Sequence, residues 1–186
     1  MKKIVFGLLI LVGFYSNAQT LTVTPNGLKD SLNVEKDYVV LNIENKTAKE
    51  LYDNILKYIN LNYKNPKEVI KGSVDSDFIK FDTYVSDFPL VKSMGTRMDM
   101  GTTYTTILTF QDNKIKYEIV DLIMKNKNGG NQAIFSGSAM SGFAIYNKSG
   151  ELKRSETKID IERYFNNNIK SIIEASYDKA KLKKDW

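Results

Sequence analysis

Apolar and β-branched residues dominate the stretch from Tyr38 to Glu44, and this pattern predicts a β-strand. Val39, Leu41 and Ile43 fall on one side of it, as in a strand with one buried face. Further stretches share this two-residue period or the same richness in β-branched and aromatic residues, and short turns separate most of them: Val69–Val74, Phe78–Val85, Met98–Phe110 and Ile115–Met124. Short turns join antiparallel neighbours, so a mostly antiparallel sheet is expected.

Two other segments carry the spacing of three and four residues that is typical of amphipathic helices. The first is expected from about Ala48 to Asn62. Thr47 and Glu50 form a capping box in front of it, and Asn65-Pro66 ends it because proline has no backbone N–H to donate. The second helix is expected to begin at Thr157 and to keep one apolar stripe to about Lys181.

The elements therefore follow the order strand, helix, four or more strands, helix. Each helix has one apolar stripe to bury, and a sheet with an apolar face offers a surface for both. This predicts an α+β two-layer sandwich whose mostly antiparallel sheet is covered by two helices. The predicted domains are a signal peptide over residues 1–18, a polar N-terminal arm over 19–37 with a turn at Pro25-Asn26-Gly27, and one α+β domain over 38–186.

The first eighteen residues have the three parts of a secretory signal peptide. Lys2 and Lys3 are followed by the apolar run Ile4–Tyr15 and by the small-residue cleavage site Ser16-Asn17-Ala18. A bilayer span needs roughly 20 apolar residues, which neither this run nor any later segment provides. We therefore expect export to the periplasm or the extracellular space, with no transmembrane span after cleavage.

Composition excludes several kinds of site. The chain has no cysteine and no histidine, which removes thiolate nucleophiles, zinc–sulfur sites and the commonest general base. Cleavage would remove two of the 27 basic residues and would leave 25 against 22 acidic ones. This weak positive charge does not favour a nucleic-acid partner, and no cofactor or metal site is expected.

Three short stretches resemble the domain of unknown function 4468 family. They are Glu50-Leu51-Tyr52 in the first helix, the corner Tyr63-Lys-Asn-Pro66, and the pair Val69-Ile70, within a similarity that covers roughly Tyr38 to Lys125. The resemblance implies an exported bacterial protein with a fold like that of the TATA-box-binding protein. It carries over no catalytic residue, because the family has no established activity, and such a fold does not by itself imply DNA binding.

The sequence favours a non-enzymatic, monomeric binding module of the cell envelope, whose partner is an unknown envelope protein or a small apolar ligand. One alternative is a carrier of a lipid-like molecule, held between the C-terminal helix and a curved sheet. Another is a hydrolase that relies on carboxylates or serine. Its serine candidate is Ser176, three residues before Lys179, although Ser176 lies on the apolar stripe of its helix.

The segment Asp87–Gly101, which follows the third predicted strand and runs into the fourth, is the candidate contact surface. Its methionines and neighbouring apolar residues suit an adaptable surface for a ligand or a protein. The alternative is that these side chains close one end of the core. The candidate contact residues are Phe88, Leu90, Met94, Met98 and Met100.

Overall fold

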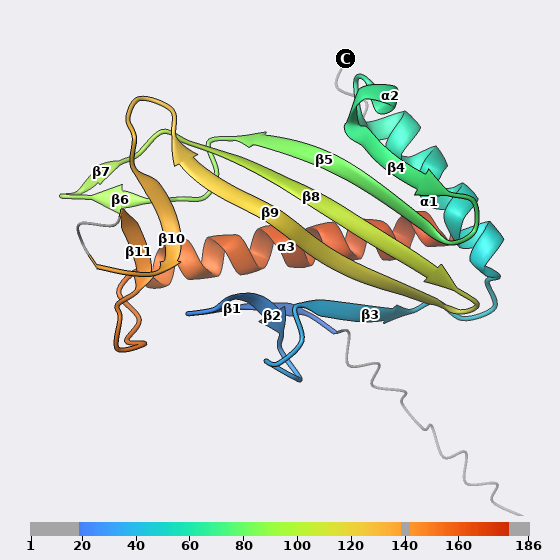
Figure 1. Ribbon diagram of the computed structural model, residues 1–186, viewed down its shortest axis with the longest axis horizontal. Helices are drawn as coiled ribbons and strands as arrows, with labels where there is room; N and C mark the ends of the chain where they lie inside the picture. Colours follow the sequence, from blue (N-terminus) through green and yellow to red (C-terminus); the bar gives the residue numbers. More distant parts are fainter. Residues whose placement is uncertain (1–18, 139–141, 179–186) are drawn as a thin grey trace, which may run out of the picture.

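A seven-stranded sheet forms one layer of the molecule, and two long helices lie across one face of it (Figure 1). This computed structural model describes residues 19–138 and 142–178. Six strands follow one another in the order β11-β10-β9-β8-β5-β4, and β3 pairs with the first part of β9. Their bounds are β3 Tyr38–Asn42, β4 Ile70–Val74, β5 Phe78–Ser86, β8 Met100–Gln111, β9 Lys114–Asn126, β10 Gln132–Ser136 and β11 Phe143–Tyr146.

The first helix, α1, extends from Ala48 to Asn62, as predicted. Its capping box is formed: the Glu50 amide donates to Thr47 Oγ1 at 3.2 Å, and the Thr47 amide donates to a Glu50 carboxylate oxygen at 2.8 Å. The second long helix, α3, extends from Ser155 to Ser176, and the predicted continuation to Lys181 lies largely outside the described residues. The α+β prediction is confirmed.

One short helix was not predicted. Pro66 ends the first long helix as expected, but it also begins the four-residue helix α2, Pro66–Val69, before β4 starts at Ile70. Proline suits the first position of a helix because its fixed φ is already helical and its missing N–H would have no partner there.

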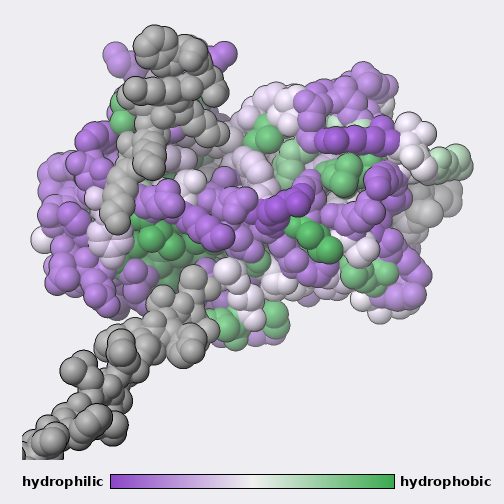
Figure 2. Space-filling view, turned by 180° about the vertical axis from the view of Figure 1, so that it is seen from behind, coloured by the Kyte–Doolittle hydropathy of each residue, from purple (hydrophilic) through white to green (hydrophobic). Residues whose placement is uncertain are grey.

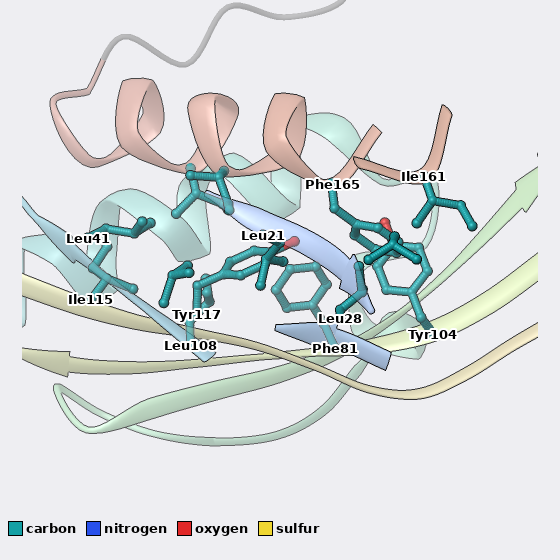
Figure 3. Close-up of a cluster of buried hydrophobic side chains, with 14 of the residues drawn as sticks. Leu21, Leu28, Leu41, Phe81, Tyr104, Leu108, Ile115, Tyr117, Ile161 and Phe165 are labelled. Carbon is teal, nitrogen blue, oxygen red and sulfur yellow. The ribbon is translucent and has the colours of Figure 1, made fainter. Parts of the chain in front are cut away.

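The core lies between the helices and the sheet. Phe165 of α3 packs on Tyr104 of β8, and Leu108 and Ile115 fill the core further along the sheet; all four are at most 4% exposed (Figure 3). Alternate residues of the long strands point into this layer, which is why β8 and β9 show the clearest period in the sequence.

The segment predicted as an N-terminal arm is instead part of the folded domain. It forms an antiparallel hairpin of β1, Leu21–Thr24, and β2, Gly27–Asp30, turning at Pro25-Asn26. Leu21 is 2% exposed and lies in the core beside α3 (Figure 3). Its amide donates to Asn166 Oδ1 at 2.8 Å, and Asn166 Nδ2 donates back to its carbonyl at 3.0 Å. Four-residue strands are too short for their alternation to stand out in a polar stretch.

Glu162 of α3 holds the same hairpin, and this gives a pH-dependent contact. One of its oxygens accepts from Thr22 Oγ1 at 2.7 Å and from the Val23 amide at 2.9 Å, and Lys158 pairs with it. Burial raises the pKa of the Glu162 carboxyl, but these donors outweigh burial and hold the pKa below its ordinary value of 4.5. The charged carboxylate therefore stabilises the folded state.

Replacing Glu162 with glutamine is expected to cost about 1 kcal/mol of folding free energy at neutral pH, allowing for solvent screening. Because the folded pKa is lowered, this contribution is present above the pKa of the unfolded chain and is lost as pH falls through the folded pKa. Urea unfolding of both proteins at pH 7 and below pH 4 measures it. The exposed Glu174→Gln on the same helix is the control, and an equal deficit at both pH values would contradict the assignment to charge.

Two further segments differ from expectation. The connection Ser86–Arg97 contains a small hairpin of β6, Lys92–Ser93, and β7, Thr96–Arg97. Residues 132–146 supply β10 and β11, which pair in parallel although a mostly antiparallel sheet was expected. Parallel neighbours were not expected because such pairing normally needs a longer crossover.

Candidate functional site

A cleft of about 420 Å³ lies between the two long helices, over the middle of the sheet. The middle of α1 touches the end of α3, where Asn54 Nδ2 donates to the Ser176 carbonyl at 2.8 Å. Away from this contact, the last turn of α1 and the central turns of α3 form the two walls. Strands β5, β8 and β9 form the floor. Six tyrosines line the cleft: Tyr58, Tyr63, Tyr84, Tyr104, Tyr117 and Tyr164.

The positions of these tyrosines follow from local structure. Tyr104 and Tyr117 occupy inward positions of β8 and β9, so the pleat turns both toward the helices. Tyr164 and Asn168 are four residues apart on α3 and therefore share one face of the helix. Tyr63 is the C-cap of α1, and its ring meets Phe81 of β5 edge-on at 5.7 Å.

Hydrogen bonds connect the walls of the cleft to its floor. Tyr104 Oη and Tyr164 Oη lie 2.9 Å apart, and Asn168 Nδ2 donates to Tyr104 Oη at 3.1 Å. On the other side, Tyr63 Oη and Thr83 Oγ1 lie 2.9 Å apart. Both pairs join a helix to a strand, so they fix the width of the cleft.

Tyr117 is the exception in this network. Its side chain is 1% exposed, and within residues 19–138 and 142–178 its hydroxyl has no hydrogen-bond partner. Burial raises the pKa of this phenol well above 10, and the Asn168 amide beside it opposes the rise. Asn168 nevertheless makes its hydrogen bond with Tyr104. Buried tyrosine hydroxyls normally find a partner, so this one marks an incomplete polar site.

The cleft is electrically neutral at its centre. Burial raises the pKa of Tyr63 to about 12, against the opposing hydrogen bond with Thr83, and it also raises the pKa of Tyr58 and Tyr104 above 10. These phenols therefore keep their protons at physiological pH. Among the lining residues that the structure describes, only Lys64 carries a charge and none is a carboxylate. The cleft can donate and accept hydrogen bonds.

The described carboxylates elsewhere do not assemble a metal site. No group of three or more acidic residues in the described ranges is placed to hold a metal ion. The carboxyl pKa values of Asp75, Asp87 and Glu151 are lowered, each chiefly by a side-chain hydrogen bond, from Ser76, Ser86 and Lys153 respectively.

The five predicted contact residues do not form one surface. Phe88 and Met100 are buried in the core, where the Phe88 ring stacks at 4.3 Å on Tyr164. Leu90 and Met98 are half-buried, and Met94 is fully exposed in the turn between β6 and β7. The alternative reading, closure of one end of the core, describes Phe88 and Met100. A contact of this segment with a partner stays a prediction.

The serine of the hydrolase alternative is in a structural position. Ser176 is buried, and its Oγ donates to the Ile172 carbonyl at 2.7 Å within α3. Its proposed base, Lys179, lies outside the described residues, as does the signal peptide over residues 1–18.

Sequence reasoning missed the tyrosine cleft. Tyr58 and Tyr104 fall within a predicted helix and a predicted strand and Tyr63 falls at the corner between elements, and nothing in the sequence indicates that the three meet. The single signal was the total of 11 tyrosines in 186 residues.

No protein-family model matches the chain, and no curated protein matches it in sequence. Within the part of the chain that the structure describes, no helix has the length and apolar character needed to cross a bilayer. Two solved structures are similar in fold. A DUF4468 family protein from Bacteroides ovatus has a TM-score of 0.50 and 14% identity, covering 79% of this chain and 87% of that chain.

The second is a TBP-like protein from Parabacteroides distasonis, with a TM-score of 0.53 and 14% identity. The match covers 76% of this chain and 91% of that chain. At this identity the likeness concerns the fold. The chain therefore has the α+β fold shared by a DUF4468 family protein and a TBP-like protein, in agreement with the resemblance that its sequence indicated.

Proposed function

We propose that this chain is an exported, non-enzymatic binding domain whose ligand is a small, uncharged molecule held in the tyrosine cleft. The observation that supports this most directly is the combination of a cleft of about 420 Å³ with a deep phenol, Tyr117, that lacks a hydrogen-bond partner among the described residues. Ligand sites commonly have about 300–1,000 Å³, an aromatic lining and a few polar groups that orient the ligand.

The cleft supports a polar ring compound better than an alkyl chain. A lipid carrier would surround its ligand with aliphatic side chains, whereas here phenol hydroxyls and the amides of Asn62 and Asn168 interrupt the apolar surface. A charged ligand is also disfavoured. No carboxylate among the described lining residues could pair with a cation, and Lys64, the one charged residue among them, is exposed to solvent, where an ion pair contributes little.

The absence of acid–base chemistry in the cleft supports a binding role over catalysis. A general acid or base works best with a pKa near the operating pH, and burial moves the pKa values of Tyr63 and Tyr104 further away from it. Figure 2 shows mainly hydrophilic residues on the face seen from behind, with apolar ones in separate patches. The monomeric state stays a prediction.

Nuclear magnetic resonance of the labelled chain tests the proposal. Three sets of probes are added separately: uncharged ring compounds, fatty acids and dicarboxylic acids. Only the uncharged ring compounds are expected to shift the side-chain amide signals of Asn62 and Asn168, whereas Asn26, in the β1–β2 turn, should not respond. Shifts caused only by the fatty acids would favour the lipid carrier, and no shift with any set would contradict a ligand site here.

A matched pair of substitutions confirms the location. Asn62→Trp places a large ring at the half-buried mouth of the cleft, whereas Asn60→Trp places it on the exposed side of the same helix. Affinity for the bound ring compound, read from the Asn168 signal, is expected to fall at least about tenfold in the first variant, which corresponds to about 1.4 kcal/mol. Equal affinities in the two variants would place the ligand elsewhere.

A further inference from the structure

The cleft contains more hydroxyl donors than it has acceptors for them. Tyr104 and Tyr164 share one hydrogen bond between two hydroxyls, so one of their two protons has no acceptor among the described residues. The same count applies to Tyr63 and Thr83. The Tyr117 proton is the third without an acceptor in the described part of the chain. The ligand must therefore bring lone pairs.

The cleft also has acceptors without a donor. Asn168 uses its Nδ2 on Tyr104, and Asn62 uses its Nδ2 on the Tyr58 carbonyl. Neither side-chain carbonyl oxygen accepts a hydrogen bond from the residues that the structure describes. Because Asn168 stands beside Tyr117 and Tyr104, free donors and a free acceptor lie together on the α3 side. A hydroxyl group satisfies such a pair, since it accepts and donates at once.

The remaining lining consists of aromatic rings on opposite sides of the cleft. Tyr63 and Phe81 lie on the α1 side, and Tyr104 and Tyr164 lie edge to face, 6.2 Å apart, on the α3 side. The face of an aromatic ring carries a negative quadrupole, which attracts weakly positive C–H groups. A saturated ring bearing hydroxyls presents C–H groups on its faces and hydroxyls on its rim.

We propose that the ligand of this cleft is a neutral saccharide. Its rim hydroxyls would accept from the Tyr164–Tyr104 pair and donate to the carbonyl oxygens of Asn168 and Asn62, and its ring would lie against the phenol rings. This inference rests on the proposed function, since it names the ligand class of the same cleft. Acidic sugars are disfavoured because no cation lies at the centre of the cleft.

The test compares neutral mono- and disaccharides with apolar ring compounds of similar size, such as naphthols, on the full chain. Binding is read from the Asn168 side-chain amide signal. Saccharides are expected to shift it, and Tyr164→Phe is expected to weaken saccharide binding about tenfold while it leaves the binding of any apolar ring nearly unchanged. Tyr38→Phe, on β3 and outside the cleft lining, is the control and should bind as the unmodified chain does.

The outcomes separate this inference from the function on which it rests. If apolar rings bind and the saccharides do not, the saccharide inference fails and the binding cleft stands. If saccharides bind with the same affinity to Tyr164→Phe, the hydroxyl pairing is wrong. If neither set shifts Asn168, the cleft holds only water and both proposals fail.

Discussion

Replacing Phe165 with alanine is expected to lower the free energy of unfolding by about 3–5 kcal/mol. Phe165 is fully buried in the middle of α3. Its ring meets those of Tyr104 at 5.1 Å, Tyr164 at 5.2 Å and Phe88 at 6.2 Å, each near a right angle. The substitution removes the ring at the centre of this cluster and leaves a cavity that the three partners, on β8, on α3 and in the loop after β5, cannot all move to fill.

Urea unfolding followed by circular dichroism measures the loss. Ile159→Ala on the same helix is the control, because Ile159 is 58% exposed and its truncation is expected to change the stability by less than about 0.5 kcal/mol. A decrease of less than about 1 kcal/mol in the free energy of unfolding of Phe165→Ala would contradict the placement of this ring in the core. Because Tyr104 and Tyr164 also wall the cleft, ligand affinity should fall together with stability in this variant.

Elements with long, regular patterns could be predicted from the sequence. The bounds of α1 follow from a capping box and four apolar residues at helical spacing, and the structure reproduces both ends. β8 and β9 contain 12 and 13 residues, which is long enough for the two-residue period to show. In such segments the local pattern and the buried face agree, so local information is sufficient.

Short and unusual elements could not be predicted, because long-range contacts determine them. The two-residue strands β6 and β7 have no period to read. The parallel pairing of β10 and β11 aligns Ala133 with Phe143, a register that no local signal in a glycine- and serine-rich stretch indicates. In each case the strand exists because of its neighbour and not because of its own sequence.

The candidate site was hidden for a related reason. Tyrosine on an inward strand position reads as an ordinary core residue, because its ring is apolar and its hydroxyl needs one partner. Tyr104 belongs to the site because its hydroxyl hydrogen-bonds with that of Tyr164, which lies 60 residues later in the sequence. The methionine-containing segment was easier to recognise as a candidate contact surface because its apolar residues lie close together in the sequence. In the structure, however, Phe88 and Met100 are buried in the core.

The N-terminal hairpin gives the sharpest test of how far the folded domain extends. Leu21→Ala is expected to cost about 2–5 kcal/mol of unfolding free energy, because Leu21 is 2% exposed and faces the core beside α3. Leu32→Ala is its matched control: the same substitution eleven positions later in the same predicted arm, at a side chain that is 66% exposed. It is expected to change stability by less than about 0.5 kcal/mol.

Thermal and urea unfolding of the two variants decide between an arm and a structural hairpin. In a loosely attached arm both leucines would be dispensable, and the two variants would unfold with the unmodified chain. In the folded hairpin only Leu21 matters, and its loss should also weaken the contact between β1 and Asn166 that holds the middle of α3. Because Asn168 lies two residues further along the same helix, Leu21→Ala is also expected to disturb the cleft, which Leu32→Ala should leave intact.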